Sequence, residues 1–122
     1  VHALAYPLGG HFHLPHGLSN ALVLLEVLRF NLPAAAARYA ELYRALDPGA
    51  AGDALTLAQR LIDRLEGHLA ASTLPRRLRE LSIPEAHLPV LAADAMKQTR
   101  LLVNNPRELG EADALAIYQA VF

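Results

Sequence analysis

Four of the six histidines in this 122-residue chain lie within residues 2 to 16, in the segment VHALAYPLGGHFHLPHGLSN. Imidazole is a good ligand for iron, zinc and similar divalent ions, and a neighbouring acceptor usually orients its second nitrogen. His2 and His16 are too far apart in sequence to share one helical face. Because Gly9 and Gly10 lie between them, we expect the chain to reverse there and bring both imidazoles to one point.

The spacing of these histidines also allows a simpler interpretation. Histidines in a loop are often solvated or hydrogen-bonded rather than bound to a metal. We expect His11 and Phe12 to approach a cleft, whereas we expect His13 to be a solvated loop residue. His68 and His87 are expected on the polar surfaces of their helices.

The composition excludes several classes of function. Eleven Lys and Arg against twelve Asp and Glu give a formal net charge of -1, which disfavours binding to nucleic acid or to an anionic membrane surface. Apolar runs such as ALVLL at 21–25 are much shorter than a bilayer span. The chain has no cysteine, so a metal site must use His, Asp or Glu. We expect a cytoplasmic protein with neither a membrane nor a nucleic-acid partner.

The elements that must position the histidines are predicted to be helices. A chain of this length forms a single core, and 53% hydrophobic residues with only 6% aromatics favour an all-α helical bundle. Apolar residues recur at helical spacing, and no segment alternates as a strand does. In the first half of the chain we expect a helix over about 16 to 30, a second that starts at Pro33 and ends near Asp47, and a third over 54–71 with Asp53 as N-cap. In the second half we expect a short turn in LPRRLREL, a fourth helix in AHLPVLAADAMKQT capped by Ser82 to Glu85, and a loop in VNNPREL. The last helix, in GEADALAIYQAVF, offers Leu115, Ile117, Tyr118 and Val121 for packing.

The residues that flank the histidines carry a specific resemblance. His2 is followed by Pro7-Leu8-Gly9 and then by Pro15-His16-Gly17, and at these intervals the segment resembles the signature of the iron-containing, or group III, alcohol dehydrogenase family. The resemblance continues through Asn20 and LRFN to NPREL and the last helix, so it covers essentially the whole chain.

This resemblance implies a fold and a place in a larger protein. The family has an N-terminal α/β domain that binds NAD(P), an all-helical C-terminal domain that is similar to that of dehydroquinate synthase, and a divalent metal in the cleft between them. Residues 1–122 would then be a single all-helical domain that lacks the α/β domain and its own first helices. By position, His2 and His16 resemble two of the metal ligands, and the other two, an Asp and a His, would precede this chain.

Tyr6, Gly9 and Gly10 are the further site candidates. Many family members have a second His near the nicotinamide where this chain has Tyr6. A phenol, with an ordinary pKa of about 10, donates a hydrogen bond but does not titrate near neutrality as imidazole does. Tyr6 is therefore either a catalytic and cofactor-binding hydrogen-bond donor or a core aromatic. Gly9 and Gly10 either let the backbone approach the cofactor or form a turn that needs positive φ.

The function implied by the resemblance is that of a metal-dependent NAD(P) alcohol dehydrogenase, which interconverts alcohols with aldehydes or ketones by hydride transfer. The metal would be iron or zinc, and the whole protein a homo-oligomer. The chain alone is expected to be inactive and to bind metal and NAD(P) weakly. One alternative is maleylacetate reductase, whose segment continues with Ala-Glu-Thr-His where this chain has Gly17-Leu18-Ser19-Asn20. The other is a helical interaction module without catalysis.

Overall fold

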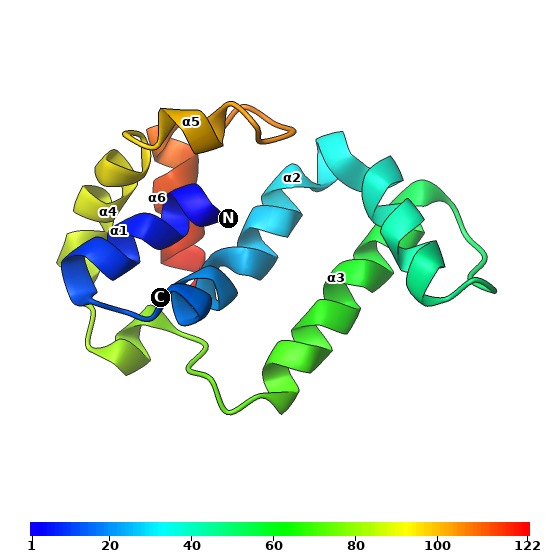
Figure 1. Cartoon of the computed structure of the whole chain (residues 1–122), viewed down its shortest axis with the longest axis horizontal. Helices are drawn as coiled ribbons and strands as arrows, with labels where there is room; N and C mark the ends of the chain where they lie inside the picture. The colour runs from blue at the N-terminus through cyan, green and yellow to red at the C-terminus, as the bar shows by residue number, and fades with distance from the viewer.

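The computed structural model describes residues 1–122 as an all-helical chain, which confirms the predicted fold class. Figure 1 shows α1, α4 and α6 gathered at one end of the molecule, while α2 leads away from them towards α3. The elements are α1 (His2–Phe12), α2 (His16–Leu46), α3 (Ala54–Ala71), the 3-10 turns η1 (Leu78–Leu81) and η2 (Glu85–His87), α4 (Leu88–Ala95), α5 (Thr99–Leu102) and α6 (Glu111–Ala120).

The turn expected at Gly9 and Gly10 is wrong, because both glycines lie inside α1 and neither has a positive φ. Leu4 and Leu8, one helical turn apart, are buried in the core and offset the roughly 1 kcal/mol that a glycine costs inside a helix. The chain reverses instead at His13, which has a φ of 54° and donates its backbone N–H to the carbonyl oxygen of Gly9 at 3.0 Å. This left-handed residue ends the helix in the manner of a C-cap.

The expected break between two helices before Pro33 is also wrong, because α2 runs continuously from His16 to Leu46. Pro33 has no backbone N–H, so the carbonyl of Arg29 lacks its usual helical partner, and a bend is expected there. Figure 1 shows that α2 changes direction along its length. Buried residues on both sides of the proline, Val27 and Ala35 among them, keep the two segments in one helix.

Two hydrophobic clusters hold the helices together. The larger joins α1, the first half of α2, α4 and α6, and contains 17 buried residues, among them Leu4, Leu8, Val23, Leu91 and Tyr118. The smaller lies between the second half of α2 and α3 and consists of Ala35, Tyr39, Ala58 and Leu61. The helix that carries His2 is thus part of the main core.

The predicted start of α3 is confirmed. The Asp53 side chain accepts a hydrogen bond of 2.7 Å from the backbone N–H of Thr56, as an N-cap does. This bond holds the pKa of the Asp53 carboxyl below its ordinary value.

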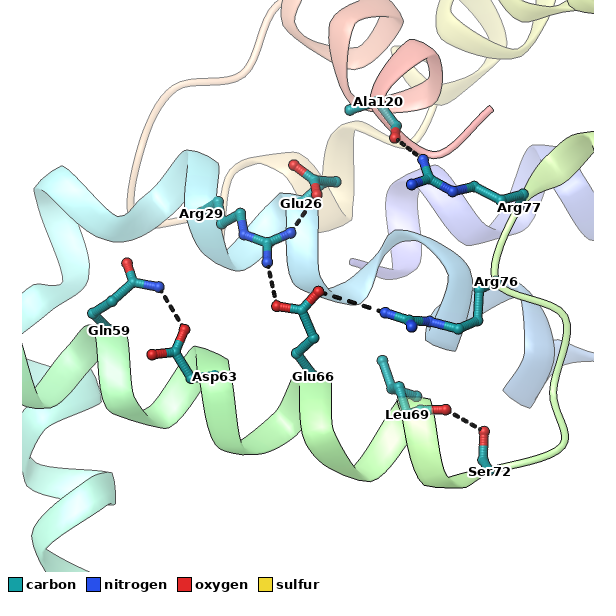
Figure 2. Close-up of polar contacts among 10 residues, drawn as sticks. All are labelled: Glu26, Arg29, Gln59, Asp63, Glu66, Leu69, Ser72, Arg76, Arg77 and Ala120. Atoms are coloured by element: carbon teal, nitrogen blue, oxygen red, sulfur yellow. Dashed lines mark hydrogen bonds and ion pairs between the residues drawn. The ribbon is translucent and has the colours of Figure 1, made fainter.

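Polar contacts join α3 to α2 near the opposite end of α3. In Figure 2, the Glu66 carboxylate accepts hydrogen bonds from Arg29 at 2.8 Å and from Arg76 at 3.5 Å, and Arg29 also pairs with Glu26. Exposed pairs of this kind contribute little individually, so they orient the two helices more than they stabilise them.

The C-terminal third follows the prediction with two differences. The turn in LPRRLREL and the last helix are present as η1 and α6, and VNNPREL is a loop that begins directly after α5. Ser82 does not cap the fourth helix: it has a φ of 58° and ends η1, and α4 begins at Leu88 after η2. The fourth helix ends at Ala95, before the expected boundary, and Thr99–Leu102 form the separate α5.

By length and composition alone, α2 would suffice to cross a membrane, since one 18-residue window of it has a mean hydropathy of 1.3. The buried core helix of a soluble protein meets the same criterion, so this is weak evidence. In this structure nine of the 31 residues of α2 are buried, and 28% of the apolar window is buried.

Candidate metal and cofactor site

The structure brings His2 and His16 together, as the sequence predicted, although by a different route. His2 is the first residue of α1 and His16 the first residue of α2, and the two helices meet through the reversal at His13. The two imidazole rings have their centroids 5.1 Å apart and are tilted by 49°. Both residues are exposed, so the two rings can be approached from outside the chain.

Asn20 contacts His16 from the next turn of α2. Its amide nitrogen lies 3.0 Å from Nε2 of His16 and donates a hydrogen bond of 2.9 Å to the His16 carbonyl oxygen. The amide oxygen of Asn20 is buried and has no hydrogen-bond partner in the chain. The sequence signal for this contact is the spacing of four residues between His16 and Asn20 on one helix.

Tyr6 lies one turn after His2 on the same face of α1. Its ring centroid is 5.9 Å from that of His16, and 49% of the residue is exposed. Tyr6 therefore does not pack in the core formed by residues 1–122. The phenol therefore stands beside the two imidazoles at the surface.

Neither glycine of α1 is required by packing inside the chain. A Cβ added to Gly10 would meet no atom within 4 Å, and one added to Gly9 would meet only the backbone oxygen of Leu14, at 3.6 Å. The positive-φ alternative is excluded, since both residues are helical. Gly10 is exposed one turn beyond Tyr6, so it leaves that face of α1 without a side chain.

The two imidazoles fit a metal ion as a partial set of ligands. No group of three or more His, Cys, Asp or Glu side chains in the chain is arranged to hold a metal. Neutral imidazole nitrogens are suitable donors for iron or zinc, and both rings are open to outside groups that could complete a site. What this chain offers is two neighbouring imidazole rings, one of which contacts the Asn20 amide through Nε2.

His11, near the end of α1, forms a second polar group. Its Nε2 contacts a carboxylate oxygen of Asp94 in α4, and its ring faces that of His87 with the centroids 5.5 Å apart. Hydrogen bonds from Lys97 and then from His11 hold the pKa of the Asp94 carboxyl below its ordinary value. A hollow of about 390 Å³ contains His11 and Asp94 together with Tyr6.

The remaining histidines meet the expectations in part. His13 and His68 are exposed, as predicted. His87 is half-buried and packs against Phe12 with the ring centroids 5.1 Å apart, so its expected position on a polar surface is wrong. The sequence carries no local signal for the contact between His11 and Asp94, which are 83 residues apart.

Comparison with known proteins finds one family across the whole chain. The model of the C-terminal region of the Fe-containing alcohol dehydrogenase family matches residues 1–122. The chain is 41% identical to long-chain-alcohol dehydrogenase 1 of Geobacillus thermodenitrificans, with all of this chain and 31% of the relative covered. It is 34% identical to 1,3-propanediol dehydrogenase of Citrobacter freundii, again over its full length and 32% of the relative.

Solved structures give the same relationship. The chain superposes on 1,3-propanediol oxidoreductase with a TM-score of 0.83 and 33% identity, over 99% of this chain and 32% of that one. For an alcohol dehydrogenase from Oenococcus oeni the TM-score is 0.87 and the identity 27%, with the same coverage. The chain therefore spans about a third of the length of these relatives.

Proposed function

The chain belongs to the iron-containing alcohol dehydrogenase family, and on this premise we propose that it is the C-terminal part of a metal-dependent NAD(P) alcohol dehydrogenase. In this proposal residues 1–122 are one helical domain, and an α/β domain that binds NAD(P) precedes it. The observation that carries the proposal is the convergence of His2 and His16 at the surface.

His2 and His16 are proposed to hold the divalent metal, iron or zinc. The metal, when bound, acts as a Lewis acid that polarises the oxygen of the alcohol or of the carbonyl compound. The chain's own contribution is to place the two imidazole rings near each other, since α1 is anchored in the main core and His16 begins α2. This placement reduces the ordering that metal binding requires.

Tyr6 is proposed as a hydrogen-bond donor to substrate or cofactor beside the metal ligands. Its exposure and its distance of 5.9 Å from the His16 ring, between centroids, support this role. Gly9 and Gly10 are proposed to let the nicotinamide part of the cofactor approach α1. The open space at Gly10 supports this role, because a side chain there would occupy the surface next to Tyr6.

The substrate is proposed to be a small alcohol or the matching aldehyde or ketone. Relatives named for 1,3-propanediol and 1-propanol support this size, whereas another relative is named for long-chain alcohols. We propose further that the protein works in the cytoplasm, as a homo-oligomer, without a nucleic-acid or membrane partner. The formal net charge of -1 supports the exclusion of nucleic acid.

The test uses the complete protein that contains this chain. Metal content is measured by mass spectrometry, and the oxidation of alcohols is followed through the absorbance of NADH or NADPH. His2→Ala and His16→Ala are expected to lose most of the bound metal and of the activity. His68→Ala, which removes an exposed histidine from α3, is the matched control and should keep both.

Other outcomes would identify the alternatives. A protein without stoichiometric metal and without activity on any alcohol would support a helical interaction module instead. Reduction of maleylacetate in preference to aldehydes would support the reductase of the same family. Metal retained in both His2→Ala and His16→Ala would contradict the assignment of these ligands.

A further inference from the structure

The amide nitrogen of Asn20 makes two contacts with one residue, His16, which lies four positions earlier on α2. It is 2.9 Å from the His16 carbonyl oxygen and 3.0 Å from Nε2 of the His16 ring. An amide nitrogen carries two hydrogens, so it can make both contacts at once. The Asn20 side chain therefore links the backbone of a candidate metal ligand to the ring of the same residue.

The contact with the carbonyl determines the direction of the contact with the ring. A carbonyl oxygen can only accept, so the Asn20 atom that faces it must be the amide nitrogen and not the amide oxygen. The same nitrogen then points its second N–H at Nε2 of His16. Two donors would repel each other at this distance. Nε2 is therefore the acceptor, and the proton of the neutral His16 ring lies on Nδ1.

The oxygen of the Asn20 amide shows that this orientation has a cost. It is buried and has no hydrogen-bond partner in the chain, and a buried acceptor without a partner is destabilising. In the reversed orientation the same oxygen would face the His16 carbonyl oxygen, which is also only an acceptor. The two contacts with His16 are thus what hold the amide in the observed orientation.

A divalent metal ion needs the lone pair that Asn20 already contacts. Imidazole binds a metal through its unprotonated nitrogen, and in the tautomer described above that nitrogen is Nε2. The nitrogen has one lone pair in the plane of the ring, which serves one partner at a time. Metal binding at Nε2 of His16 therefore requires the release of one hydrogen bond from Asn20, while the bond to the carbonyl oxygen can remain.

The surroundings of His16 keep the energy of this exchange small. The His2 and Tyr6 rings lie beside the His16 ring, with centroids 5.1 and 5.9 Å away, and neither makes a hydrogen bond to it in this structure. His16 is exposed, so water can take the place of the Asn20 amide at Nε2. Only the net value of one hydrogen bond, protein partner against water, then separates the two situations.

We propose that Asn20 fixes the tautomer of His16 and competes with the metal ion for Nε2, so that it weakens metal binding at the pair of His2 and His16. The inference rests on the proposed function, in which these two histidines are metal ligands, and adds to it the residue that adjusts the affinity of the site. The net value of one hydrogen bond corresponds to about a two- to tenfold change in a binding constant. Competition of this size lowers the affinity without preventing binding.

The test measures the zinc affinity of the complete protein, after its metal has been removed, by competition with a chromogenic chelator. Asn20→Leu keeps a branched side chain of similar size but has no amide, and it is expected to bind zinc about two- to tenfold more tightly than the unaltered protein. Gln59→Ala, which removes an exposed amide bond to Asp63 at the same four-residue spacing on α3, is the control and should leave the affinity unchanged. A purely structural role of Asn20 has the opposite result, because a displaced His16 binds zinc more weakly.

Nitrogen NMR of the histidine side chains gives a readout that needs no change at Asn20. The chemical shifts of ring nitrogens distinguish protonated from unprotonated atoms, and His16→Gln identifies the His16 signals by their loss. In the unaltered protein after metal removal, we expect the proton of neutral His16 on Nδ1. In Asn20→Ala, where the amide is absent, we expect signals from both tautomers.

The outcomes separate this inference from the proposed function. A zinc affinity that is equal or lower in both Asn20→Leu and Asn20→Ala, or a His16 proton found on Nε2 in the unaltered protein, would overturn the inference alone. If zinc binding by the unaltered protein does not depend on His2 and His16, the proposed ligands are wrong, and the competition proposed for Asn20 fails with them.

Discussion

The hydroxyl of Tyr118 donates a hydrogen bond of 2.7 Å to the carbonyl oxygen of Leu4, 114 residues away in the sequence. This buried contact ties α6 to α1, the helix that carries His2 and Tyr6. Burial raises the pKa of the Tyr118 hydroxyl well above its ordinary value, so the group remains a donor across the physiological range. The last helix, α6, thereby fixes the position of the first helix, α1.

Tyr118→Phe removes only this hydroxyl. We expect the free energy of unfolding to fall by about 1 kcal/mol, the net value of one buried hydrogen bond. Urea titration followed by circular dichroism measures the change. Tyr43→Phe is the control, because Tyr43 is only half-buried and makes no side-chain hydrogen bond in this structure. A loss of equal size in both variants would contradict the role of the contact.

Leu8→Ala tests the anchoring of α1. Leu8 is fully buried in the larger cluster, and we expect its truncation to lower the free energy of unfolding by about 2 to 5 kcal/mol, through lost burial and a cavity. Leu42→Ala, at a position that is 57% exposed, should have little effect. Thermal melting of both variants gives the comparison. Equal melting temperatures would show that α1 does not belong to the core.

The chain expressed alone should fold as a helical bundle, since both clusters lie within residues 1–122. It should nevertheless be inactive and bind zinc weakly, because it provides two imidazoles and no third ligand. Circular dichroism and calorimetric titration with zinc check these expectations. Oxidation of NADH with short aldehydes by the isolated chain, abolished in His2→Ala or His16→Ala, would show that it is sufficient for activity.

The capping bond of Asp53 should make the stability of α3 depend on pH. Because the folded state lowers the pKa of this carboxyl, its contribution is present above the ordinary Asp pKa of about 3.9 and is lost as the pH falls through the folded value. Asp53→Asn keeps an acceptor but no charge. We expect it to melt below the unaltered chain at neutral pH and at the same temperature in acid. A constant difference at every pH would contradict this.

The sequence predicted the helices whose apolar spacing is regular and whose ends carry a clear signal. α3 is the clearest case, since Asp53 marks its start. α1 was missed because Pro7 and two glycines occur within eleven residues, and local propensity gives no indication that Leu4 and Leu8 are buried by α4 and α6. For the same reason the sequence predicts a boundary at Pro33, where α2 is continuous. In both cases tertiary packing outweighs the local preference.

In the candidate site, too, the features with a local sequence signal could be predicted and those set by tertiary packing could not. His2 and His16 could be found from residue type and flanking sequence, and their proximity could be predicted without the correct path between them. Asn20 could have been found from its helical spacing to His16. The contacts of His11 with Asp94 and of Asn31 with Asn105 join residues 83 and 74 positions apart, and only the tertiary structure brings them together.

The bend at Pro33 separates the two hydrophobic clusters along one helix, and this has a consequence for local unfolding. The smaller cluster has four buried residues against 17 in the larger, so the end of the molecule formed by the second half of α2 and α3 buries fewer side chains even with Ala40, Leu57 and Ile62 included. Amide hydrogens in that hairpin should exchange with solvent through openings that leave α1, α4 and α6 intact. The histidine pair would then keep its geometry while the far hairpin opens and closes.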